Sequence, residues 1–166
     1  MTEARPAGKT TEAPRVRLGQ MTADALASMP WLAAALAPEW SLSDLEAAVT
    51  DGSGVLIRDS EGAAIGVAVV LRGAPDAGSA TVPFLAIEPE RRFRGLGGEA
   101  GLALDGELRD EGFSKVYAPV PDGRGLAVYF WLRLGFRPLT TPDSTGVLVG
   151  LSKQPVRGIW MLRDGP

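Results

Sequence analysis

The sequence contains neither cysteine nor histidine. Without cysteine the chain has no disulfides, no thiolate nucleophile and no zinc site built on sulfur. Without histidine it has no Ser-His-Asp triad, no histidine general base and no histidine metal ligand. Any acid–base chemistry therefore falls to carboxylates, tyrosine, lysine or water, and no metal site is expected.

Long apolar runs are also missing from the 166 residues. The longest, such as 64–71, fall far short of the roughly 18 residues that a membrane helix needs. No apolar segment follows the N-terminal charges, as a secretory signal would require, so a cytoplasmic protein is expected. A net charge of −3 argues against a general nucleic-acid binder.

The length suits one domain with a full core. Residues 1–15 mix proline, glycine, threonine and charges without periodicity, which predicts a disordered leader before a single domain at 16–166. Residues 141–158 are also expected to form mostly loop.

Apolar periodicity and turn residues predict the elements of the remaining chain. Strands are expected at 16–18, 55–57, 65–71, 81–87, 116–120, from 136 onward and at 159–162. Helices are expected at 23–36, capped by Thr22 and interrupted by Pro30, and after a capping box of Ser43 and Glu46. Two more are expected, one after the glycine-rich loop at 92–98 and one at 125–134. This order predicts a mixed sheet with helices on both faces, in the α/β or α+β class.

The loop at 92–98 has the composition of a phosphate site. A helix start leaves backbone N–H groups unpaired and carries about half a positive charge, and glycines let an anion approach the backbone closely. Arg92 and Arg94 add donors suited to phosphate. A tight turn with solvated arginines is the alternative interpretation. A Walker loop does not fit, because no lysine follows the glycines, and the spacing Gly-x-Gly-Gly differs from a dinucleotide fingerprint.

Two segments resemble the GNAT superfamily of N-acetyltransferases. The family hallmark Arg/Gln-x-x-Gly-x-Gly/Ala after a strand and a proline is similar to residues 85–97, LAIEPERRFRGLG, with Arg92, Gly95 and Gly97 on the hallmark positions. Phe93 departs from the small or polar residue usual there. About thirty residues later, 127–136, AVYFWLRLGF, resembles the family's Ala-x-x-x-Tyr-x-x-x-Gly-Phe segment. The resemblance implies a mostly antiparallel sheet of about six or seven strands with about four helices.

The resemblance also implies a co-substrate and its site. Acetyl-CoA would bind with its pyrophosphate on the amides of the loop and its pantetheine arm along a strand end that separates from its neighbour. The residues implied are Leu85, Ala86, Ile87, Arg92, Phe93, Arg94, Gly95, Leu96, Gly97, Gly98 and Arg124. A primary amine would attack the thioester directly, so that positioning and polarisation supply most of the catalysis.

Catalytic side chains are harder to assign. Trp131 stands where the family often has an acidic tyrosine, and core packing is the simpler interpretation of it. Tyr129, two residues earlier, is the remaining candidate acid. Arg124 replaces the family's asparagine and is either a CoA ligand or a solvated arginine. Glu88 is the candidate base, acting through a water, unless it forms only a surface ion pair. Asp122 and Tyr117 are further candidates.

The acceptor is expected to be a small-molecule or protein amine. Trp31, Glu39 and Trp40 would form an aromatic, acidic pocket for it, with Asp44, Trp160 and Met161 as further candidates, although core packing explains the tryptophans equally well. Two rival interpretations remain open. One is a GNAT-like module that binds CoA without turnover, and the other is an interaction domain without a ligand. The resemblance also leaves a homodimer open.

Overall fold

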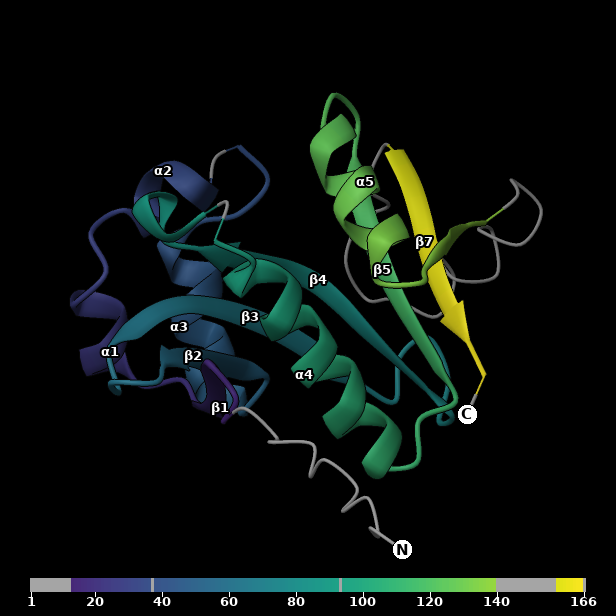
Figure 1. Cartoon of the computed structure of the whole chain (residues 1–166), viewed down its shortest axis with the longest axis horizontal. Coiled ribbons are helices and arrows are strands. Elements are labelled where there is room, and N and C mark those ends of the chain that lie inside the picture. The colour runs from purple at the N-terminus through teal and green to yellow at the C-terminus, as the bar shows by residue number, and fades with distance from the viewer. Residues whose placement is uncertain (1–12, 37, 93, 140–157, 166) are drawn as a thin grey trace, which may run out of the picture.

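The computed structural model describes residues 13–36, 38–92, 94–139 and 158–165. Within these ranges a seven-stranded sheet has the order β1-β2-β3-β4-β5-β7-β6 (Figure 1). The strands are β1 (Val16–Gln20), β2 (Gly54–Asp59), β3 (Ala64–Arg72), β4 (Ser79–Ile87), β5 (Lys115–Pro121), β6 (Arg137–Pro138) and β7 (Gly158–Asp164). Paired strands run antiparallel except β4 and β5, which are parallel. The predicted mixed, mostly antiparallel sheet is therefore confirmed.

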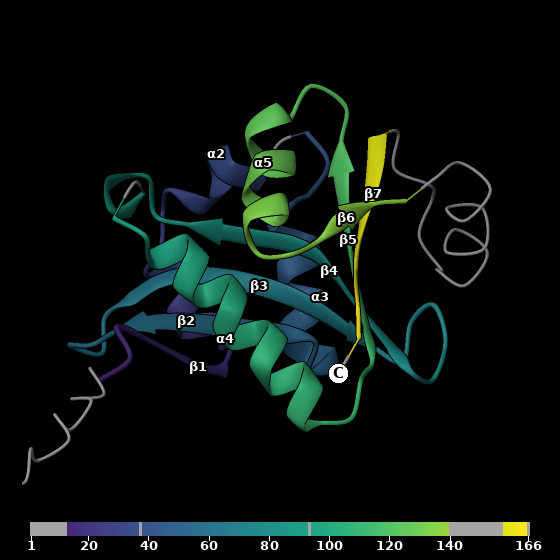
Figure 2. The ribbon, with the colours of Figure 1, turned by 45° about the vertical axis from the view of Figure 1, so that its right-hand side comes forward.

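Helices cover both faces of the sheet (Figure 2). They are α1 (Ala23–Ala27), α2 (Leu32–Leu36), α3 (Leu42–Asp51), the 3-10 helix η1 (Pro89–Arg91), α4 (Leu96–Asp110) and α5 (Gly125–Arg133). Helices α1 to α3 bury one set of sheet side chains, and α4 and α5 bury the set on the opposite face. None of the described helices is long and apolar enough to cross a membrane. Of the predicted loop at 141–158, the described residues include Gly158 alone, which begins β7.

The helix starts agree with the sequence at one position and differ at another. Thr22 caps α1 as predicted, and its side chain accepts the N–H of Ala25 at 3.2 Å. The predicted capping box of Ser43 and Glu46 is wrong, because Ser41 is the N-cap of α3 and Asp44 completes its box. Both serines precede an acid by three residues, so the local pattern fits either start. The extended backbone of Ser41, with φ −130° and ψ 163°, fixes the earlier one.

Strands β4 and β5 separate soon after they pair. Their register covers Ser79, Ala80 and Thr81, opposite Lys115, Val116 and Tyr117, and then ends. Immediately beyond, Val82 and Pro83 both lie opposite Val70 of β3, which is a β-bulge in β4.

Two prolines keep the separated edges from pairing. Pro83 lies in the bulge and has no N–H to donate. Pro119 of β5 lies opposite Trp160 of β7. The carbonyl of Trp160 accepts from Leu139, on the β6 side, at 2.8 Å. By the alternation of an antiparallel pair, Pro119 therefore faces away from β7 and towards β4.

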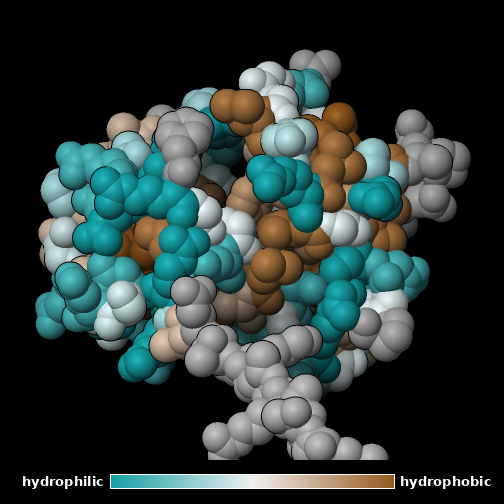
Figure 3. All heavy atoms as spheres, viewed as in Figure 1, coloured by the Kyte–Doolittle hydropathy of each residue, from teal (hydrophilic) through white to brown (hydrophobic). Residues whose placement is uncertain are grey.

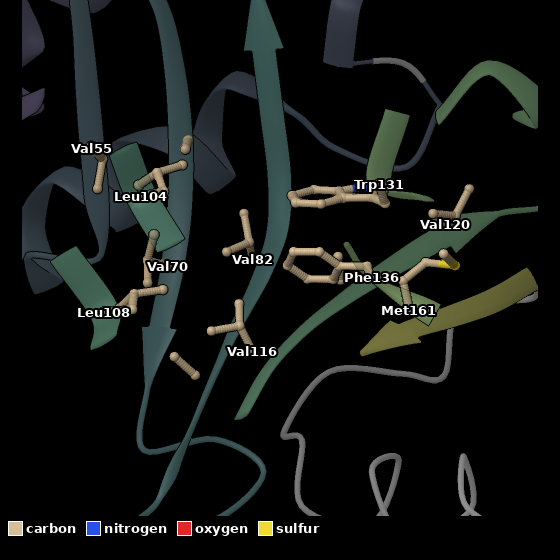
Figure 4. Close-up of a cluster of buried hydrophobic side chains, with 13 residues drawn as sticks. Val55, Val70, Val82, Leu104, Leu108, Val116, Val120, Trp131, Phe136 and Met161 are labelled. Atoms are coloured by element: carbon tan, nitrogen blue, oxygen red, sulfur yellow. The ribbon is translucent and has the colours of Figure 1, made fainter. Parts of the chain in front are cut away.

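Aromatic side chains fill the space behind the separated strands. The ring centroids of Trp131, from α5, and Phe136, just after it, are 4.8 Å apart. Both side chains are buried, with Trp131 7% exposed, and they belong to the same core cluster as Val82 and Val120. Figure 4 shows the two rings between Val82 on one side and Val120 and Met161 on the other. The two rings pack between β4 and β5 and hold the strands apart. The interpretation of Trp131 as a core residue is confirmed.

The packing of Trp131 predicts that alanine variants at two positions of α5 differ in stability. Trp131→Ala should lower the free energy of unfolding by about 3–5 kcal/mol, because it leaves a large cavity in the main core. Tyr129→Ala is the control, since Tyr129 is 59% exposed, and it should cost less than about 1 kcal/mol. Urea denaturation of both variants measures the difference. Equal losses would show that the ring of Trp131 does not support the core.

Candidate functional site

The loop between β4 and α4 ends in an uncapped helix start. Gly95 is the N-cap of α4, has a φ of +77° that favours glycine, and offers no side chain to cap the helix. The N–H of Glu99 donates to the carbonyl of Gly95 at 3.1 Å. The preceding amides of Leu96, Gly97 and Gly98 therefore have no acceptor within the helix, and the positive end of the helix dipole lies at the same place.

Packing against the described residues does not require the glycines in the first turn of α4. Among the described residues, a Cβ on Gly98 would meet no atom within 4 Å, and one on Gly97 would come no closer than 3.6 Å, to Phe130. A Cβ on Gly101, one turn later, would instead overlap Leu134. Glycine in a helix costs about 1 kcal/mol relative to alanine. Glycine at these two positions therefore lowers the stability of the helix. A bound anion that comes close to the backbone would explain why glycine is present there.

The arginines of the loop have different surroundings. Arg92 donates its backbone N–H to Pro89 at 3.3 Å, which closes the 3-10 turn, and its Nε to the carbonyl of Ile87 at 3.2 Å. Its predicted backbone contact with phosphate would therefore compete with this turn. Arg94 is exposed to solvent. Phe93 lies outside the described residues.

An ion pair anchors η1 to the hairpin between β2 and β3. Arg91 donates to Asp59 at 2.8 Å, and the buried Asp59 carboxylate also accepts the N–H groups of Ala63 and Glu61 at 2.9 Å each. The Ala63 bond, together with the Arg91 and Glu61 bonds, holds the pKa of Asp59 below its ordinary value. Glu88, the predicted base, lies beside the same guanidinium, with 3.6 Å between its Oε2 and the Nε of Arg91.

The separated edge of β4 presents backbone groups to the gap. Glu88 donates its N–H to Ile65 of β3 at 2.8 Å, and the register continues from this pair to Ile87, Ala86 and Leu85. Alternate residues of an antiparallel strand face the partner. Leu85 and Ile87 therefore direct their N–H and C=O groups towards the gap, whereas Ala86 faces β3.

The candidate acid and base are not brought together by the fold. Tyr129 lies on the exposed side of α5, where Arg133 is 5.8 Å from the centre of its ring. Glu88 is beside Arg91 at the end of β4. Of the other candidates, Asp122 is exposed after β5 and Tyr117 is buried in β5.

Two residues predicted to serve different ligands form an ion pair. Arg124, the N-cap of α5, donates to Glu39, which lies between α2 and α3, at 2.9 Å. This contact joins segments of the α1–α3 side and the α4–α5 side. Figure 3 shows the surface hollowed between the part that carries α2 and the part that carries α5.

The two tryptophans predicted at the acceptor site are partly buried, and Glu39 is exposed. Trp40 packs on Phe84 of β4 with 5.4 Å between ring centroids, and Trp31 packs against the cluster under α1 to α3. Phe84 was not singled out in the sequence, although its place in the strand before the loop could have indicated it. The other candidates have structural roles. Asp44 caps α3, Trp160 packs on Tyr117, and Met161 is in the main core.

The rest of the described structure holds weaker candidates for a functional site. An open depression lined by Leu18, Val55, Arg72 and Glu107 lies towards the opposite end of α4 from the loop. Among the residues that the structure describes, no group of three or more carboxylates could hold a metal ion.

No family model and no curated protein sequence matches this chain. Solved structures do match it. An acetyltransferase from Thermus thermophilus has a TM-score of 0.67 at 22% identity, over 90% of this chain and 96% of that one. The ribosomal-protein-S18-alanine N-acetyltransferase of Escherichia coli has a TM-score of 0.65 at 17% identity, over 90% and 93%. A GNAT phosphinothricin acetyltransferase from Sinorhizobium meliloti, in complex with acetyl-CoA, has a TM-score of 0.63 at 18% identity, over 91% and 89%.

These identities are low, and the likeness is one of fold. The chain has the fold of the GNAT acetyltransferases over about nine-tenths of its length. The fold that the two sequence motifs implied is confirmed.

The buried carboxylate of Asp59 predicts a pH-dependent contribution to stability. Because its pKa is lowered in the folded chain, its contribution is present above the unfolded value of about 3.9 and is lost as the pH falls through the folded value. Asp59→Asn should therefore lower Tm near pH 7, and the Tm difference from wild type should shrink below about pH 4. Asp110→Asn, exposed at the end of α4, is the control. A Tm difference that stays constant from pH 7 to pH 2.5 would contradict this role.

Proposed function

We propose that the chain is an acyl-CoA-dependent N-acyltransferase that uses acetyl-CoA and transfers the acetyl group directly to a primary amine. The observation that carries this proposal is the uncapped, glycine-lined start of α4 at the end of the strand edge that faces the gap. Acetyl-CoA supplies the thioester carbonyl that the amine attacks. The GNAT fold of the chain supports the same assignment.

The start of α4 suits the diphosphate. The amides of Gly95, Leu96, Gly97 and Gly98 would hold the anion, with the helix dipole adding favourable charge. Arg94, exposed beside them, would supply a charge-assisted donor. Arg92 would act mainly by keeping the turn closed onto Ile87, and Phe93 would contribute as part of the same loop.

The gap between β4 and β5 suits the pantetheine arm. Leu85 and Ile87 face it with backbone N–H and C=O groups, which are the partners that an amide-containing arm needs, and Ala86 lies between them. The Ile87 carbonyl already accepts from Arg92, so an arm amide would share it. The opposite edge carries Pro119, which leaves the arm without competition from a strand donor. Arg124 would close the site from the start of α5.

Catalysis would rest on positioning and on backbone donors more than on a strong acid or base. Glu88 and Tyr129 remain the proposed base and acid. The Glu88 carboxylate is held beside Arg91, with 3.6 Å between its Oε2 and the Nε of that guanidinium. Solvent can reach the exposed Tyr129 and exchange its proton.

The proposed acceptor is an amine of a small molecule or a protein, taken up beside Trp31, Glu39 and Trp40. The ring of Trp40 suits an ammonium group. The carboxylate of Glu39 would pair with that ammonium in exchange for, or together with, Arg124. Two proteins of the same fold are named for a ribosomal-protein alanine and for phosphinothricin. The fold therefore occurs in enzymes named for a protein acceptor and for a small-molecule acceptor.

A second candidate function is a CoA-binding module without turnover. The observation that favours it is the burial of Trp131 in the core at the position of the expected tyrosine. Binding and turnover therefore need separate tests.

The binding test uses two glycines of the same helix. Gly98→Leu should raise the Kd for CoA by at least about tenfold, because the side chain would fill the space beside the free amides. Gly106→Leu is the matched control, since a Cβ there also meets no atom of the described part of the chain within 4 Å. Neither change should lower Tm, because leucine favours helix more than glycine does. Calorimetry with CoA measures the Kd, and equal affinities of both variants would contradict the site.

The turnover test follows thiol release from acetyl-CoA with a panel of amines. Glu88→Gln and Tyr129→Phe should each lower kcat by less than about tenfold if positioning dominates. A loss of about a hundredfold or more would show that proton transfer by that residue, and not positioning, supplies most of the catalysis. Wild-type protein that binds CoA and releases no thiol with any amine would favour the module without turnover.

A further inference from the structure

Arg15 lies directly against the loop that precedes α4, although 79 and 84 residues separate it from its two partners. Its Nε donates to the carboxylate of Glu99 at 2.6 Å, and its Nη1 donates to the carbonyl of Arg94 at 3.1 Å. Its Nη2 lies 3.1 Å from the position that a Cβ on Gly95 would take. The three nitrogens of one guanidinium therefore lie against Glu99, Arg94 and Gly95.

The contact with Arg94 fixes the direction of one peptide group. A trans peptide is planar, so the carbonyl of Arg94 and the N–H of Gly95 point in opposite directions. Since the guanidinium of Arg15 holds the carbonyl on one side, the N–H of Gly95 is directed to the other side. That N–H is one of the amides proposed to bind the diphosphate.

The contact with Glu99 compensates a charge. Glu99 lies in the first turn of α4. Its carboxylate interacts favourably with the helix dipole there, but it would repel a bound diphosphate. Its side chain is 35% exposed, so the repulsion is only partly screened by water. The guanidinium at 2.6 Å neutralises the carboxylate and also keeps it on the side of the loop where Arg15 lies.

We infer that Arg15 is a positioning residue of the CoA site, which orients the Gly95 amide and shields the diphosphate from Glu99. This inference rests on the proposed acyl-CoA function. It assigns a role at the site to the last residue of the segment that the sequence predicted to be a disordered leader. The described part of that segment begins at residue 13.

The test is a double-mutant comparison of CoA affinity in the full chain. Arg15→Ala should raise the Kd for CoA by about tenfold, because Glu99 is left uncompensated and the peptide is no longer held. Adding Glu99→Gln to Arg15→Ala should recover part of that loss, since the repelling charge is gone. Arg15→Lys should be intermediate, because one ammonium lacks the planar fork that reaches both partners.

Controls distinguish this role from a loss of folding stability and from an effect of net charge on CoA affinity. Arg17→Ala removes an exposed arginine of the strand that follows, for which the described residues give no ion pair, and it should leave the Kd within about twofold. Tm is measured for every variant. With acetyl-CoA and an active amine, Arg15→Ala should raise KM for acetyl-CoA more than it lowers kcat, because it acts at the diphosphate end.

The outcomes are distinguishable. An unchanged Kd in Arg15→Ala overturns the inference while wild-type binding still supports the proposed function. A loss that Glu99→Gln does not recover, and that equals the loss in Arg17→Ala, also overturns it, because net charge alone would then explain the effect. If the wild-type chain binds no CoA, the proposed function fails first.

Discussion

The separation of β4 from β5 is the constraint on which the rest of the structure depends. Two parallel strands normally pair along their length, yet here the pairing ends after Thr81 and Tyr117. Pro83 and Pro119 remove donors from the facing edges, and the rings of Trp131 and Phe136 occupy the space behind them. Backbone groups of β4 that no longer pair with β5 need other polar partners, and the opened sheet is where we propose that the amide-containing arm of CoA binds.

The loop at the end of this gap is held by residues from distant parts of the chain. Asp59 in the β2–β3 hairpin anchors Arg91, and Arg15 before β1 holds the carbonyl of Arg94. Both contacts tie the loop to neighbouring elements, while among the described residues nothing lies within 4 Å of a Cβ position on Gly98. If the loop binds the diphosphate as proposed, a loop already held by these contacts would lose less conformational entropy on binding.

The chemistry proposed for the gap is limited by the residue types available. With no histidine and no cysteine, proton transfer depends on carboxylates, on tyrosine or on solvent, and the candidates lie apart at Glu88 and Tyr129. The ion pair of Arg124 and Glu39 places opposite charges between the two halves of the molecule. Composition alone excluded the histidine mechanisms, but it could not reveal that a residue proposed for CoA and one proposed for the acceptor would neutralise each other.

The sequence by itself determined the element order, the mixed sheet and the place of the glycine-rich helix start, because apolar periodicity, glycines and prolines act on the chain locally. It left the start of α3 ambiguous, since Ser41 and Ser43 present the same local spacing to an acid. Only the tertiary structure decided which side chains meet: Arg15 with Glu99, Arg91 with Asp59, and Trp40 with Phe84. Such contacts depend on strand register and on the crossing of helices over the sheet, which bring together residues that no local pattern connects.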